Sequence, residues 1–201
     1  MKKRTQNGFT LYELLTTVAV VGIVLVIGVP NLGAYRQNAR MTSTANDLHS
    51  AFHLARTEAT RGKQNVTICA SATSMDANPV CGGTWDQGYI VFYDTDGNIQ
   101  TGGVDETIIR RQPAIAEGIT LAVADDATYF GFAATGRGRG KVGVLDQVTQ
   151  VVMCDDRGNI RAAGGNSASR LFVATPLGRA TIQRDMSMIT EALTDMDKTC
   201  P

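Results

Sequence analysis

The apolar and polar positions divide this chain into three stretches. Residues 1–8 carry three basic side chains, residues 14–35 carry no charged side chain, and charges return from residue 36 onward. As a helix, the uncharged stretch would extend about 33 Å at roughly 1.5 Å per residue, which is enough to cross the hydrocarbon core of a bilayer. We therefore predict a transmembrane or filament-core helix over residues 9–35, kinked at Pro30 because proline removes a backbone donor.

After this stretch the apolar positions repeat with the spacing of a helix that has one apolar face. They recur every three or four residues, with charged side chains between them, at Met41, Ala45, Leu48, Phe52, Ala55 and Ala59. Residues 36–62 are thus predicted to be the amphipathic second half of the helix, ending at Gly62. The apolar face most simply packs on a sheet; a coiled-coil seam is the alternative.

Beyond Gly62 the period of the pattern falls towards two, which is typical of strands. Gly, Asp and Asn residues suited to turns separate the apolar runs. The predicted strands are 65–70, 88–93, 106–112, 118–123, 128–133, 148–154, 170–175 and 179–183, followed by a polar tail from 184 to 201. One long helix and many short strands favour an α+β fold, with the helix packed on antiparallel sheet in a single β-rich domain over residues 63–201.

The residues where the basic leader meets the apolar run form a motif. Gly8-Phe9-Thr10-Leu11-x-Glu13-Leu14 resembles the signal of type IV prepilins and type II secretion pseudopilins. In that family a prepilin peptidase cleaves after the glycine and N-methylates the new terminal residue, which implies that residues 1–8 are a leader cut off between Gly8 and Phe9. An ordinary secretory signal has its small-residue cleavage site after the apolar region instead.

A second resemblance covers most of the remaining chain. The stretch from Trp85 to Gly97, then Phe130-Gly-Phe132, Cys154 and Leu177-Gly178-Arg179, is similar to the H-type pseudopilins and the FimT/FimU minor pilins. The resemblance implies a pilin-like fold and a structural role in the assembly or initiation of a type IV pilus or a type II secretion pseudopilus, with no enzyme activity and no cofactor. A FimT-type minor pilin that binds DNA during uptake is the alternative.

The same resemblance implies a location and a set of partners. The chain would be a single-pass protein of the bacterial inner membrane, with a cytoplasmic N-terminus and a periplasmic domain, since basic residues stay on the cytoplasmic side. It would be incorporated into the pilus or pseudopilus. Its partners would be the prepilin peptidase, other minor and major pilins or pseudopilins, the inner-membrane assembly platform and the inner-membrane lipid.

Glu13 is a lone carboxylate at the start of the apolar run. Cleavage after Gly8 would create an α-ammonium group at Phe9, and at an effective dielectric constant near 20 a pair of charges 4 Å apart is worth about 4 kcal/mol before desolvation. The residues alone allow this pair within one subunit or between neighbours. The resemblance implies the second arrangement, in which Glu13 of an incoming subunit meets the terminal amine of a docked one during assembly.

The net charge of the chain argues against general nucleic-acid binding. Without Lys2, Lys3 and Arg4 the side chains count 16 basic against 19 acidic, so the mature chain lacks the overall basic character of a nucleic-acid binder.

The four cysteines, in a domain outside the cytoplasm, favour disulfides. Three pairings are open; we prefer Cys69 with Cys81 and Cys154 with Cys200. A zinc site is the rival, but no C-x2-C spacing occurs.

A glycine-rich basic string is the sharpest local feature of the domain. Gly136-Arg137-Gly138-Arg139-Gly140-Lys141 would present three cations that could contact phosphate or DNA. Some FimT-type pilins bind DNA through a Gly-Arg-x-Arg motif near the C-terminus, where this chain has Gly178-Arg179 without a second arginine. A solvated hairpin tip is the simpler interpretation, and a contact with another subunit is a third.

The remaining candidate sites are weaker. Residues 94–98 (Asp-Thr-Asp-Gly-Asn) contain carboxylates, but their glycine is fourth rather than sixth as in a calcium loop, which favours a turn. His49 and His53 share a helix face without the Glu of an H-E-x-x-H site, so no metal is predicted. The chain has no nucleophile elbow and no phosphate-binding loop, and we predict no catalysis.

Overall fold

The structure is a computed structural model that describes residues 8–103, 106–143, 145–162 and 164–200, leaving out the side chains of 27, 29–31 and 125. Residues 1–7 of the predicted leader thus lie outside the described residues. The chain divides into two compact units, residues 1–39 and 40–201. Helix α1 (Leu11–Gly62) contributes to both, and it ends at the glycine predicted from the sequence. It runs through Pro30, whose side chain is not described, and the kink there stays a prediction.

The second unit contains two four-stranded antiparallel sheets. The first has the strand order β3-β2-β1-β5 and the second β4-β6-β7-β8. The strands are β1 (Val66–Ala70), β2 (Tyr89–Tyr93), β3 (Ile108–Gln112), β4 (Ile119–Val123), β5 (Tyr129–Phe132), β6 (Gln150–Asp155), β7 (Arg170–Ala174) and β8 (Ala180–Gln183). All eight predicted strands are confirmed, with ends that differ by at most two residues. The α+β class is confirmed as well.

The apolar face of α1 fills the space between the two sheets. All six stripe residues named from the sequence are at most 2% exposed. Side chains along a strand alternate between the two faces of its sheet. Ile68 of β1 and Met153 of β6 lie on the inner faces and share one core with Phe52 of α1. The coiled-coil alternative is therefore wrong for residues 41–59, because this face is covered by sheet.

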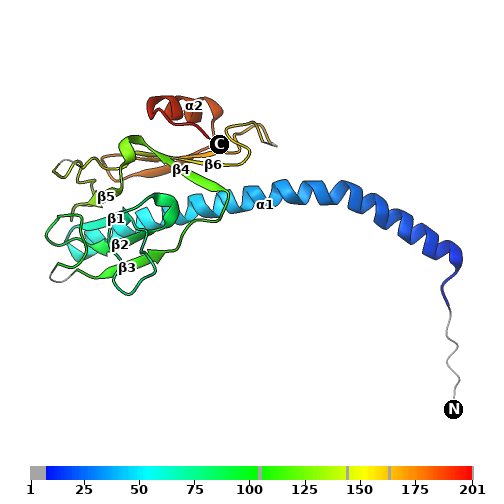
Figure 1. The fold of residues 1–201 in the computed structure, drawn as a ribbon, viewed down its shortest axis with the longest axis horizontal. Coiled ribbons are helices and arrows are strands. Elements are labelled where there is room, and N and C mark those ends of the chain that lie inside the picture. Colours follow the sequence, from blue (N-terminus) through cyan, green and yellow to red (C-terminus); the bar gives the residue numbers. More distant parts are fainter. Residues whose placement is uncertain (1–7, 104–105, 144, 163, 201) are drawn as a thin grey trace, which may run out of the picture. The chain divides into compact units, whose positions relative to one another are not determined.

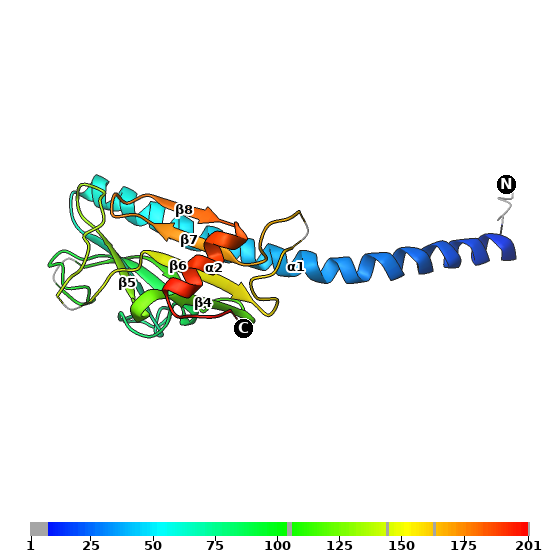
Figure 2. The same cartoon turned by 90° about the horizontal axis from the view of Figure 1, so that it is seen from above.

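The outer face of each sheet is covered too. Cys69, Ile90 and Phe92 pack under loop residues, among them Ile99. On the other sheet, Val152 and Leu171 pack against a second helix, α2 (Met186–Asp195). Figure 1 shows α2 above β4 and β6, and Figure 2 shows it lying across β6 and β7. Burial on both faces explains why β6 is apolar along most of its length.

Helix α2 corrects the expectation of a polar tail after residue 184. The Asp185 side chain caps it by accepting hydrogen bonds from the backbone N–H groups of Ser187 (2.9 Å) and Met188 (3.2 Å). Its buried face consists of Ile189, Ala192 and Leu193, followed by Met196.

Both preferred disulfides are confirmed, Cys69–Cys81 and Cys154–Cys200. The second ties the end of the chain to β6, as expected for Cys200.

Candidate functional site

The first turn of α1 holds Glu13 in a reciprocal pair of hydrogen bonds with Thr10. The backbone N–H and the hydroxyl of Thr10 donate to Oε2 of Glu13 at 2.9 and 2.8 Å, and the backbone N–H of Glu13 donates to Oγ1 of Thr10 at 3.2 Å. This is a capping box, which satisfies backbone donors at a helix start. The Thr-x-x-Glu spacing signals it in the sequence, and our sequence reasoning did not use that signal.

One oxygen of this carboxylate stays free for another partner. Among the described residues, Oε1 of Glu13 has no hydrogen bond, while Oε2 takes both donors from Thr10. The capping box thus fixes the carboxylate at the start of the helix and leaves it an open acceptor. Phe9, the residue after the predicted cleavage point, is 89% exposed.

The first unit leaves large apolar side chains uncovered. The exposed ones between residues 9 and 35 are Phe9, Leu11, Tyr12, Leu14, Leu15, Val18, Val20, Val21, Ile23, Val24, Leu25, Val26, Leu32 and Tyr35. A contiguous apolar surface of this kind marks a contact with lipid or protein.

Within the described part of the chain, no helix is long and apolar enough to cross a membrane.

The basic string of residues 136–141 does not present three solvated cations, because two of the three have an ion-pair partner among the described residues. Arg139 points inward: its Nη1 lies 2.6 Å from Oδ2 of Asp94, and its Nη2 donates to the carbonyl of Gly97 at 2.7 Å. Lys141 pairs with Asp146 at 2.9 Å. Arg137 is exposed and has no ion pair among the described residues.

Asp94 is the buried end of this interaction. Its side chain is 0% exposed, and it also accepts hydrogen bonds from the Thr67 hydroxyl (2.7 Å) and the backbone N–H of Ile99 (3.3 Å). Ligand atoms of Asp94, Asp96 and Glu106 lie within 4.8 Å of one another. Arg139 supplies the positive charge at this cluster, which is what a buried carboxylate requires.

The structure brings the two Gly-Arg sequences together. The N–H of Gly138 donates to the carbonyl of Pro176 at 2.9 Å. A Cβ on Gly178, which has φ +74°, would lie 2.2 Å from the carbonyl oxygen of Gly136, so only glycine fits there. Arg137 and Arg179 are both exposed and follow these two touching glycines.

A third arginine approaches the same loops from α1. The Nε of Arg56 lies 3.4 Å from the position that a Cβ on Gly136 would occupy. Arg56, which is half-buried, thus lies beside the loop of exposed Arg137, which touches the loop of exposed Arg179. We call these three residues, which come from three separate segments, the arginine surface. Sequence reasoning predicted two of its members and missed Arg56, because only the fold places this turn of α1 beside the loop.

The two histidines lie beside each other on α1, with their rings inclined by 66°. Their Nε2 atoms are 3.2 Å apart, and the Nε2 of His49 also lies 3.3 Å from the carbonyl oxygen of Ala180 at the start of β8. Burial, His49 and Arg56 lower the pKa of His53, in that order of size, so the neutral form is favoured.

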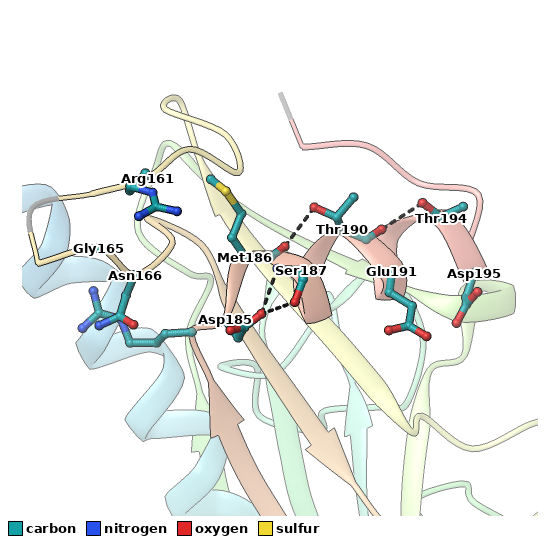
Figure 3. A pocket seen from close by; sticks show the side chains of 11 residues that line it. Arg161, Gly165, Asn166, Asp185, Met186, Ser187, Thr190, Glu191, Thr194 and Asp195 are labelled. Atoms are coloured by element: carbon teal, nitrogen blue, oxygen red, sulfur yellow. Dashed lines mark hydrogen bonds between the residues drawn. The ribbon is translucent and has the colours of Figure 1, made fainter.

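An open cavity of about 710 Å³ lies beside α2. Figure 3 shows Arg161 and Asn166 on one side of it and Ser187, Thr190 and Glu191 on the other. Hydrogen bonds from the Ser187 hydroxyl and from the backbone N–H groups of Met188 and Ser187 hold the pKa of Asp185 below its usual range. The lining therefore offers polar contacts of both signs, and the Ser187 hydroxyl donates to the Asp185 carboxylate that caps the helix.

Comparison with known protein families gives a match to the N-terminal region and a match to most of the second unit. The family described as type II transport protein GspH matches residues 44–178, and the prokaryotic N-terminal methylation motif matches residues 3–29. Two sequences named fimbrial protein from Pseudomonas aeruginosa are each 32% identical over 73 residues, which is 36% of this chain. The chain spans 46% of the length of these curated relatives.

The chain also aligns with two solved structures, each at a TM-score below 0.5. The type IV minor pilin FimU of Pseudomonas aeruginosa aligns with a TM-score of 0.48 and 16% identity, over 76% of this chain and 94% of FimU. The minor pseudopilin EpsH from the type 2 secretion system of Vibrio cholerae aligns with a TM-score of 0.44 and 11% identity, over 72% of this chain and 97% of EpsH.

Proposed function

Because the chain belongs to the family of the type II transport protein GspH, a family of minor pilins and pseudopilins, we propose that it is a structural subunit that takes part in assembling or initiating a type IV pilus or a type II secretion pseudopilus. The observation that carries this proposal is the uncovered apolar surface of residues 9–35, headed by one carboxylate and attached to a domain with its own core. An enzyme would need a catalytic group, and we propose that the chain has no catalytic activity.

The N-methylation motif and the family imply a subunit anchored in the inner membrane. We propose that it crosses this membrane once, with the leader in the cytoplasm and residues 40–201 in the periplasm. The two disulfides support the periplasmic location, since they persist in an oxidising compartment. The prepilin peptidase, the assembly platform, the membrane lipid and other major and minor pilins or pseudopilins are its proposed partners.

The capping box supports a role for Glu13 in assembly. Thr10 holds Oε2, and Oε1 remains available for the terminal ammonium of a neighbouring Phe9. That contact would neutralise two charges in apolar surroundings, where each alone is costly. Glu13→Ala is expected to leave processing intact and to reduce incorporation into filaments, measured by the amount of subunit in sheared filament fractions. Normal incorporation of the variant would refute the role of Glu13.

Processing is tested by the intact mass and the N-terminal residue of the protein extracted from membranes. The expected species begins with N-methylated Phe9, and Gly8→Ala is expected to retain residues 1–8. A chain that still begins with Met1 in cells with an active prepilin peptidase would overturn the assignment. A mature-sized product from Gly8→Ala would place the cut elsewhere.

DNA binding is a second candidate function, favoured by the arginine surface. Arg137 and Arg179 are exposed on touching loops, where their guanidinium groups can reach the same phosphate backbone. Arg137→Gln with Arg179→Gln is expected to weaken retention of double-stranded DNA by the full chain in detergent and to flatten its dependence on salt. Lys141→Gln, which alters a paired cation in the same loop, is the matched control. Equal retention by both variants would exclude the arginine surface.

A further inference from the structure

The chain contains two histidines, and the fold directs both at one point. Their rings are 4.4 Å apart between centroids and inclined by 66°, with the two Nε2 atoms 3.2 Å apart. Two imidazole nitrogens that bind one zinc ion at about 2.0–2.1 Å lie roughly 2.9–3.4 Å from each other, for angles between 90° and the tetrahedral value. The observed separation falls inside this interval.

The Nε2 atom of His49 has two close neighbours that can each accept a hydrogen bond, and it can carry at most one proton. The carbonyl of Ala180 only accepts, and a neutral imidazole carries one N–H. If His49 carries its proton on Nε2, Ala180 and His53 compete for it. If His53 carries its proton on Nε2 instead, it can donate to His49, and the Ala180 carbonyl oxygen then faces the occupied Nε2 of His49 without a donor. A cation placed between the two Nε2 atoms would bind both lone pairs, with the ring protons on Nδ1.

Among the described residues, thiolates and carboxylates compete little with the two imidazoles for a transition-metal ion. All four cysteines form disulfides, so thiolate does not compete. The carboxylate cluster of Asp94, Asp96 and Glu106 is neutralised in part by Arg139. Imidazole prefers late first-row transition ions such as Zn²⁺, Ni²⁺ and Cu²⁺.

We propose that His49 and His53 form a binding site for one such divalent transition ion. Spacing of four residues on one helix face is the arrangement that lets two histidines bind the same metal. His53 is exposed, which gives water access to the remaining coordination positions, and His49 contacts the edge strand β8. The site therefore lies where α1 meets the edge of the second sheet. Arg56, one turn after His53, opposes the charge of the ion and weakens its binding.

Calorimetric titration of the full chain in detergent with Zn²⁺ alone tests the proposal. One ion per chain is expected, and His49→Gln or His53→Gln should each weaken the affinity at least tenfold. Arg56→Gln should strengthen it. Asp96→Asn, which alters the carboxylate cluster, is the control and should leave the affinity unchanged. Unfolding curves without metal, followed by the fluorescence of the single tryptophan, check that each variant is folded.

The titrations distinguish the histidine site from the carboxylate cluster and from the absence of a site. Absence of zinc binding, or equal affinity of the wild type and both histidine variants, would overturn the site. Loss of binding in Asp96→Asn alone would assign the ion to the carboxylates. Electron paramagnetic resonance of bound Cu²⁺ adds a direct readout: nitrogen hyperfine coupling from two imidazoles is expected, and it should be absent in the double histidine variant.

Discussion

Arg139→Gln is expected to lower the free energy of unfolding of the domain by about 3–5 kcal/mol, the usual cost of removing one partner from a buried ion pair. Asp94 is fully buried and Arg139 is 14% exposed, with 2.6 Å between them. The variant leaves the Asp94 carboxylate with two neutral donors and no cation. Urea unfolding followed by the fluorescence of Trp85, which is 2% exposed, measures the loss.

Arg137→Gln is the matched control for this prediction. It makes the same chemical change two residues earlier, at an exposed position, where the free energy of unfolding should change by about 0.5 kcal/mol or less. Asp94→Asn combined with Arg139→Gln should cost less than the sum of the single changes, because the two groups interact directly. An equal, small loss in Arg137→Gln and Arg139→Gln would contradict the structural role of the pair. If Arg139→Gln shows the expected large loss, a DNA-retention defect in that variant reflects unfolding rather than a lost phosphate contact.

Phe52→Ala is expected to cost about 3–5 kcal/mol, because it leaves a cavity where α1 meets both sheets. The Phe52 ring lies 4.8 Å from Phe130 of β5 and 4.6 Å from Phe172 of β7, measured between ring centroids. Those two strands belong to different sheets. Loss of the ring therefore removes contacts that hold the helix and the sheets together, and the same fluorescence-detected urea curve reports it.

Two further substitutions calibrate this result. Phe52→Leu keeps most of the volume and should cost less than about 2 kcal/mol. Leu177→Ala removes an apolar side chain that is 58% exposed and should change the free energy of unfolding by about 0.5 kcal/mol or less. If Phe52→Ala costs no more than Leu177→Ala, the core does not depend on this contact.

The strands and the helix stripe were predictable because each rests on a local period. Apolar residues at intervals of two mark the strands, and the stripe from Met41 to Ala59 needs only the helical period. Helix α2 was missed because it has ten residues, and its apolar face is mixed with threonine and methionine. Its signals were Asp185 before the first turn and the spacing of Ile189, Ala192, Leu193 and Met196.

The candidate sites were less predictable because their partners are distant in sequence. Arg139 and Asp94 are 45 residues apart, and no local pattern distinguishes Arg139 from its exposed neighbour Arg137. The same holds for the approach of Gly178 to Gly136 and for the position of Arg56. The N-terminal motif could be recognised because it depends on residue type and order. The cysteine count favoured disulfides but left three pairings open, since a bridge between residues 46 apart depends on a contact across the fold.

The bridge between Cys154 and Cys200 also decides how the chain would respond to mechanical tension. The two cysteines are 46 residues apart. A pull on the C-terminal end would pass through the sulfur atoms directly into β6, and α2, β7 and β8 would lie in a loop that carries no load. At about 3.3–3.6 Å per extended residue, roughly 150 Å of chain would be kept from stretching. Reduction of this disulfide would release that length, so the oxidised domain is the less extensible one.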